Sequence, residues 1–127
     1  MVFEAKCSEN LDAAACLLPD DARDDCFPNA CASRAYYAAY LATAERMQRL
    51  GAGFTAAAGS HYRHDSLPED AARLGILDED DRDDLILLRD RRVKADYWED
   101  NIDLEEASGA HEVAARLVQK LLHGSGT

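Results

Sequence analysis

Residues 89–97 carry the side chains of this chain that are best suited to bind an anion. At 3.6 residues per turn, Arg89, Arg92 and Asp96 fall within an arc of roughly 60° on a helix, so guanidinium and carboxylate groups share one strip. Such a strip can bind a phosphate group or another anion. The alternative is an i,i+4 surface ion pair of Arg92 with Asp96, which contributes only about 0.3–0.5 kcal/mol.

Earlier in the chain, tyrosines set among alanines form a second segment whose side chains could take part in binding or catalysis. On a helix, Tyr36 and Tyr40 share a stripe with Thr43 and Met47, and Tyr37 lies on the adjacent stripe. A tyrosine stripe at helical spacing usually packs in a core or an interface, with its hydroxyls hydrogen-bonded. We therefore expect both stripes to face protein.

The spacing of the apolar residues predicts the elements that position these side chains. Apolar residues recur at helical spacing, and Ser8, Pro28, Ser66 and Asp78 are candidate helix starts. Gly51 is a candidate helix stop, and residues 51–68 have the composition of a loop. The predicted helices span residues 8–18, 28–50, 66–74, 78–98 and 104–121. Short connections and the lack of strand-like alternation favour an all-α fold, an antiparallel bundle of four to five helices.

Length and charge limit the classes of protein to which the chain can belong. Its 127 residues, 47% of them hydrophobic, suit one helical domain over residues 1–123, followed by a flexible tail at 124–127. The formal net charge of −11 repels nucleic acid, which disfavours general nucleic acid binding unless the arginines are concentrated in one place. The alanine and tyrosine surfaces favour a symmetric homodimer.

The amino terminus and the cysteines bear on the compartment. The chain has neither a basic segment followed by an apolar run at its start nor an uninterrupted stretch of about 18 apolar residues, so we expect a cytoplasmic protein without a membrane segment. Cys7, Cys16, Cys26 and Cys31 form no CxxC pair. We interpret them as reduced thiols, with Cys16 and Cys31 behaving as small hydrophobes, and expect neither a metal site nor a cofactor.

The motifs together resemble those of a known family. The chain is similar to the small prokaryotic HEPN proteins, of the short uncharacterised subgroup with an RxxADY motif, in residues 33–40 (SRAYYAAY), 60–61 (SH) and 88–97 (LRDRRVKADY). The resemblance implies a helical dimer with a composite site. It also implies a minimal nucleotidyltransferase as partner, and in some members that partner adenylylates a tyrosine beside the motif. By analogy Tyr97 is a candidate for this modification, although we favour packing of this residue against the helix that carries the tyrosines.

The chain departs from the pattern of the HEPN ribonucleases, in which a histidine follows the arginine after four to six residues. Asp96 and Tyr97 stand at that end of the motif instead. Cleavage of RNA without a metal needs groups that exchange protons near neutral pH, a role that suits histidine. Adjacent arginines would lower the pKa of Asp96, so this carboxylate is a poor base.

Other histidines are candidates to supply the missing group. The pair Arg116 and His123 matches the literal spacing but ends the last helix, so we interpret it as chance, with His123 as a helix-end residue. His61 and His64 lie in the predicted loop, which could bring either of them toward the arginine strip. His111 is interpreted as a surface or packing residue.

Three functions follow from these observations. In the first, the protein is a HEPN component of a toxin–antitoxin or defence-type module, dimeric with a nucleotidyltransferase partner, and binds nucleotide or RNA through Arg89, Arg92 and Tyr97. In the second, it is a metal-independent ribonuclease toxin in which Arg92 holds the scissile phosphate and Asp96 or a loop histidine exchanges protons. In the third, it is a structural helical dimer whose polar strip is an ion-pair network.

Overall fold

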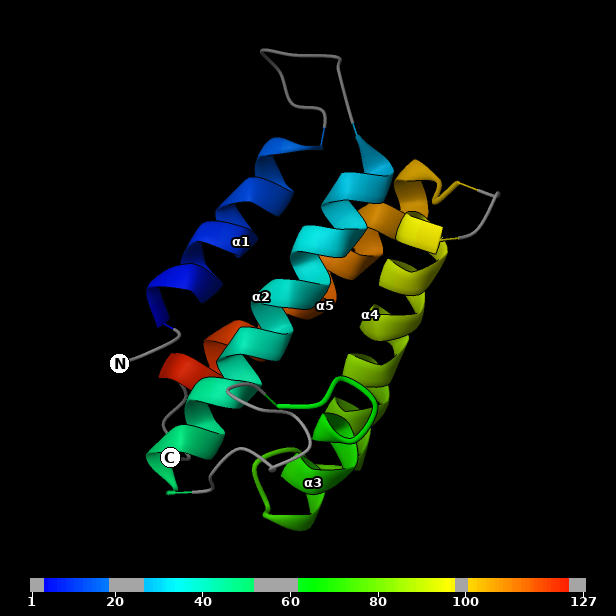
Figure 1. The fold of residues 1–127 in the computed structure, drawn as a ribbon. Helices are drawn as coiled ribbons and strands as arrows, with labels where there is room; N and C mark the ends of the chain where they lie inside the picture. Colours follow the sequence, from blue (N-terminus) through cyan, green and yellow to red (C-terminus); the bar gives the residue numbers. More distant parts are fainter. Residues whose placement is uncertain (1–3, 19–26, 52–61, 98–100, 124–127) are drawn as a thin grey trace.

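The computed structural model of the chain describes residues 4–18, 27–51, 62–97 and 101–123, and these residues form a bundle of α-helices. α2 packs against α1, α4 and α5; α1 and α4 flank it on opposite sides, and α5 lies behind it (Figure 1). Neighbouring helices α1 and α2, and likewise α4 and α5, run in opposite directions (Figure 1). The all-helical prediction is therefore confirmed, with these bounds: α1 Glu4–Cys16, α2 Pro28–Arg49, α3 Leu67–Arg73, α4 Glu79–Tyr97 and α5 Leu104–His123.

The central helix α2 begins and ends where the sequence predicts. Pro28 occupies its first turn, where the missing backbone N–H costs nothing, and Gly51 follows its end with a φ of 77°. Its alanines from Ala32 to Ala44 are buried and let α1 and α5 approach closely. The stripe of Tyr36, Tyr40, Thr43 and Met47 is buried as expected.

Side-chain caps fix the starts of α4 and α5. Asp78 caps α4, because its Oδ1 accepts a hydrogen bond from the backbone N–H of Asp81 at 2.8 Å. At the start of α5, Asp103 and Glu106 form a reciprocal capping box, with each side chain accepting the other's backbone N–H at 2.7 and 3.2 Å. The sequence pattern D-x-x-E signals this capping box, and Asp103 was not among the predicted helix starts.

Two helix starts differ from the prediction. α1 begins at Glu4, so Ser8 lies inside the helix and does not cap it. Ser66 stands at the N-cap position of α3, but its side chain makes no capping hydrogen bond, and its backbone has helical dihedrals of −110° and −14°. That short helix is held by the buried Leu67, Pro68 and Ala71 instead.

The thiols are only partly as expected. Cys31 is buried, and so is Cys7, but Cys16 is exposed at the end of α1, so its interpretation as a packed small hydrophobe is wrong. Cys26 lies outside the described residues, as do most of the predicted loop at residues 52–61 and the tail at 124–127.

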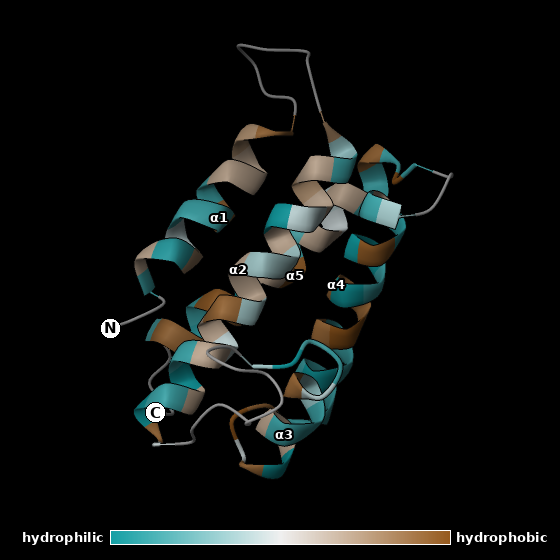
Figure 2. Ribbon diagram, in the orientation of Figure 1, coloured by the Kyte–Doolittle hydropathy of each residue, from teal (hydrophilic) through white to brown (hydrophobic). Residues whose placement is uncertain are grey.

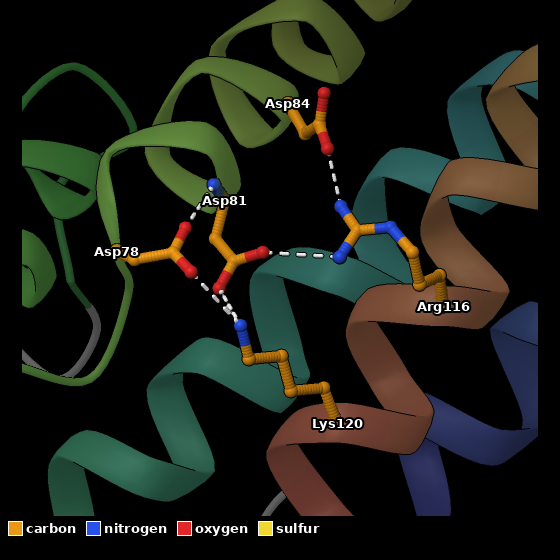
Figure 3. A network of polar contacts seen from close by, with 5 residues as sticks. All are labelled: Asp78, Asp81, Asp84, Arg116 and Lys120. Atoms are coloured by element: carbon orange, nitrogen blue, oxygen red, sulfur yellow. Dashed lines mark hydrogen bonds and ion pairs between the residues drawn. The ribbon is translucent and has the colours of Figure 1, made fainter.

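Ion pairs join α4 to α5 near the start of α4. Asp81 is only 1% exposed, and its carboxylate lies 3.0 Å from Nη1 of Arg116 and 2.6 Å from Nζ of Lys120. Arg116 also pairs with Asp84, and Lys120 with Asp78 (Figure 3). The two basic side chains of α5 are thus held by carboxylates at the start of α4.

Polar and apolar residues alternate along α4, as Figure 2 shows by the alternating teal and brown of its ribbon. Beside it, a groove of about 280 Å³ runs between α4 and α5, and its wall includes Leu87, Leu88, Gly109, Ala110 and Val113. No helix in the described part of the chain is long and apolar enough to cross a bilayer.

Candidate anion-binding site

Arg92 lies between two tyrosine rings near the end of α4. Its guanidinium carbon is 5.4 Å from the ring centroid of Tyr37 on α2 and 5.3 Å from that of Tyr97, so both rings make cation–π contacts with it. Its Nη2 donates to the hydroxyl of Tyr37 at 2.9 Å and, more weakly, to that of Tyr97 at 3.4 Å. The guanidinium is therefore held in one orientation by two aromatic side chains.

The predicted pair of Arg92 with Asp96 is present. Oδ2 of Asp96 lies 3.1 Å from Nε of Arg92, and it also accepts a hydrogen bond from Ser33 Oγ at 3.4 Å. The side chains are 18% and 31% exposed, so this pair is more sheltered than an ordinary surface pair. Nε of Arg92 is itself buried, and within the described ranges its N–H is not directed at any hydrogen-bond acceptor, Asp96 included. The contact is thus an ion pair without good hydrogen-bond geometry.

Arg89 lies on the same face of α4 as Arg92 but makes different contacts. Its Nη1 donates to the backbone carbonyls of His64 and Asp65, at 3.3 and 3.4 Å. The structure therefore does not bring the three residues of the predicted strip into one contact. Instead, Arg89 anchors the segment before α3 to α4, one turn from Arg92.

That segment places His64 against the tyrosines of α2. Its ring stacks on Tyr40 with centroids 4.4 Å apart, meets the ring of Tyr37 edge-on at 5.9 Å, and has Nδ1 2.5 Å from the hydroxyl of Tyr36. Burial raises the pKa of Tyr36, so this hydroxyl keeps its proton at neutral pH. A protonated phenol can either donate to Nδ1 or accept from it.

Further hydrogen bonds fix the path of the chain into His64. The hydroxyl of Tyr40 donates to the backbone carbonyl of Tyr62 at 2.6 Å, and Gln48 Nε2 donates to the hydroxyl of Tyr62 at 3.1 Å. Burial raises the pKa of Tyr40 and Tyr62, so both phenols stay protonated. The tyrosine stripe thus has a second role beyond packing, because it positions an imidazole.

Tyr97 is 70% exposed at the end of α4. Packing against α2, which the sequence favoured for this residue, is therefore wrong; Arg92 is its ring and hydroxyl contact instead. The exposed ring leaves a surface on which a flat ligand group can stack.

Arg116, His123 and His111 fall outside this site. Arg116 is held by Asp81 and Asp84, and His123 is an exposed residue at the end of α5, so the literal match between them forms no shared contact. His111 is half-buried on α5. His61 lies outside the described residues.

Sequence reasoning found Arg92, Asp96 and His64 but missed the partners Ser33 and Tyr37. Ser33 and Tyr37 are four residues apart, so helical spacing alone places them on one face of α2. Nothing in the linear sequence says that this face meets α4 at Arg92, because that requires the packing of two helices.

Comparison with other proteins adds no relative to this description. No family model matches the chain, and no curated protein or solved structure shows significant similarity to it.

Proposed function

We propose that the protein is a HEPN-type component of a prokaryotic toxin–antitoxin or defence-type module, and that it binds the phosphate of a nucleotide or RNA at Arg92. The observation that supports this is the guanidinium of Arg92, held between the rings of Tyr37 and Tyr97 and hydrogen-bonded to the hydroxyl of Tyr37. An arginine fixed in this way is suited to a phosphate, and the exposed ring of Tyr97 to a base.

Asp96 occupies the position that such a phosphate would compete for. Its carboxylate pairs with Arg92 without a directed hydrogen bond from Nε. A phosphate oxygen with better geometry satisfies this buried N–H, and hydrogen bonds to charged groups contribute about 1.5–3 kcal/mol. Displacement of Asp96 is therefore part of the binding step in this proposal.

The test is the affinity of the purified protein for short single-stranded RNA and for mononucleotides. Arg92→Ala is expected to weaken binding by about tenfold or more, as loss of a charge-assisted hydrogen bond implies. Arg34→Ala is the matched control, because Arg34 is an exposed arginine of α2 that contacts Asn10 rather than the site. Equal affinities for wild type and Arg92→Ala would rule out this site as the binding locus.

The partner is a second part of the proposal. We expect a homodimer that associates with a minimal nucleotidyltransferase. Two observations support this expectation: the motif resemblance, and the net charge of −11, which would attract a basic partner. Co-purification with a nucleotidyltransferase encoded nearby, and a dimer mass in sedimentation, are the tests. The exposed hydroxyl of Tyr97 suits nucleotidylation, and mass spectrometry of the co-expressed protein would detect the added nucleotide.

Ribonuclease activity is the second candidate function, and the position of His64 favours it. The imidazole of His64 and the guanidinium of Arg92 both contact Tyr37, so a proton-exchanging group and a phosphate-binding group flank one side chain. In this function Arg92 holds the scissile phosphate, and His64 or Asp96 exchanges protons. Cleavage of RNA by wild type but not by Arg92→Ala would support it, and intact RNA with both proteins would reject it.

A further inference from the structure

Arg92 and His64 contact the same tyrosine from different directions. The guanidinium of Arg92 lies over the ring of Tyr37, and the imidazole of His64 approaches the same ring edge-on, with an interplanar angle of 88°. Arg89, one turn from Arg92, binds the backbone carbonyl of His64. Contacts with α2 and α4 thus fix both the imidazole and the guanidinium, and the side chain of Tyr37 lies between them.

We propose that His64 is a second ligand-binding residue of the Arg92 site, that it contacts the phosphodiester backbone of the ligand as an imidazolium, and that binding therefore takes up a proton. This inference rests on the phosphate-binding function proposed above and adds a residue and a pH dependence to it. Tyr36 is the positioning residue, since its hydroxyl meets Nδ1 of the imidazole.

The charged groups around His64 explain why the proton comes with the ligand. Arg89 from α4 binds its carbonyl, Arg92 lies across Tyr37, and the nearest carboxylate in sequence, Asp65, is already paired with Arg63 through two hydrogen bonds of 3.1 Å. The α2 side that faces the ring consists of the phenols of Tyr36, Tyr37 and Tyr40. Cationic neighbours disfavour a protonated imidazole in the free protein, and a bound phosphodiester offsets them.

The hydroxyl of Tyr36 can serve both protonation states of the ring. It donates to Nδ1 when that nitrogen carries a lone pair, and it accepts from Nδ1–H when the ring is protonated. The ring of Tyr40 also favours the protonated form of His64, because an imidazolium stacked on this ring gains a cation–π contribution. Protonation therefore needs no rearrangement of the segment that carries His64.

The direction of the pH dependence follows from linkage. If the ligand raises the pKa of the imidazole, affinity is highest at low pH and falls as the pH rises through the pKa of the bound state. A rise of about one unit in the imidazole pKa on binding corresponds to a change in affinity of up to about tenfold, so we expect the dissociation constant to rise by up to about tenfold between about pH 5.5 and about pH 7.5.

The ligand in the test is a short oligoribonucleotide with hydroxyl ends and 2′-O-methyl groups. Hydroxyl ends matter because a terminal phosphate itself titrates near pH 6 and would imitate the effect, whereas internal phosphodiesters do not. The 2′-O-methyl groups prevent cleavage during the measurement. A dinucleotide with hydroxyl ends is measured in parallel, and comparable binding of both would show that one phosphodiester suffices.

His64→Asn is expected to lose the gain in affinity at low pH, so that its dissociation constants at pH 5.5 and at pH 7.5 are the same. His123→Asn, an exposed histidine on α5, and His61→Asn in the preceding segment are the controls and should keep the full gain. Retention of the pH dependence by His64→Asn, its loss in His61→Asn, or a flat profile for wild type would each overturn the inference. Failure of wild type to bind at any pH would instead reject the proposed function.

A spectroscopic measurement covers the case in which His64→Asn does not fold. In wild type with isotope-labelled histidine, the resonance of His64 should titrate at higher pH when the oligoribonucleotide is bound than when it is absent. Tyr36→Phe removes the hydroxyl and should reduce this shift while the cation–π pair at Arg92 stays in place. An unchanged titration on ligand addition would overturn the inference without any variant at position 64.

Discussion

Two cysteines show how single residues adapt to the close approach of the helices. Cys7 of α1 donates its thiol proton to the backbone carbonyl of Ala38 at 3.1 Å, and Cys31 of α2 is placed to do the same to Ala107 at 3.7 Å. Burial raises the pKa of Cys7 to about 12, with Glu4 adding to the effect, and that of Cys31 to about 11. These thiols act as small apolar groups with a weak donor, not as nucleophiles.

The raised pKa values predict alkaline lability. The folded pKa of each thiol exceeds the unfolded value of about 8.5, so their contribution to stability is complete below that pH and is lost as the pH rises toward about 11 and 12. Urea denaturation at pH 7 and at pH 10 should show a lower free energy of unfolding at pH 10. A Cys7→Ala/Cys31→Ala double variant should lose part of that difference, and an undiminished difference would assign it to other groups.

At the scale of elements, α4 is tied to α5 toward both of its ends. Near its start, Asp81 binds Arg116 and Lys120 (Figure 3); near its end, Arg91 and Lys94 reach Glu106, at 2.9 and 3.4 Å. The wall of the groove between α4 and α5 includes Arg91 and Glu106 of the second set. Since α4 carries Arg89 and Arg92, the ion pairs with α5 set the position of the candidate site.

Asp81 is the buried carboxylate of α4, so its loss should destabilise the protein more than the loss of an exposed carboxylate of the same helix. It is buried and paired with two cations, so Asp81→Ala leaves both cations without this partner. Arg116 and Lys120 are about half exposed and can be resolvated, which reduces the cost to about 2 kcal/mol. Urea denaturation measures the change, with Glu79→Ala as the control because Glu79 is largely exposed. Equal stability of the two variants would show that the network contributes nothing measurable.

Local chemistry made most of the elements predictable. Pro28, Gly51 and Asp78 act on their own helix ends, so their effect can be deduced from the sequence, and the i,i+4 pair of Arg92 with Asp96 depends only on helix geometry. The turn of Arg89 toward the carbonyl of His64 could not be predicted, because it depends on where the segment before α3 passes α4. The exposure of Tyr97 was missed for a related reason, since packing against α2 depends on where α4 ends relative to that helix.

At the scale of the whole molecule, the net charge of −11 repels any polyanion, so binding must depend on the few cationic residues at the site. Single-stranded nucleic acid binding has a salt slope of about −0.7 per phosphate neutralised. With Arg92 alone in contact, we expect a slope of the logarithm of the binding constant near −0.7 at pH 7.5, and near −1.4 at pH 5.5, where His64 adds a second cation. Titrations at several salt concentrations measure it. A slope several times steeper would indicate a broad basic surface, which contradicts a site built on one arginine.

The groove between α4 and α5 also has space for a substitution that would raise the stability of the protein. A Cβ added at Gly109 would meet nothing within 4 Å, and glycine inside a helix costs roughly 0.5–1 kcal/mol relative to alanine. The bundle thus retains a flexible residue at a position where close packing does not require one. An engineer who wished to raise the melting temperature without touching the tyrosines, the arginines or the ion pairs would begin at this position of α5.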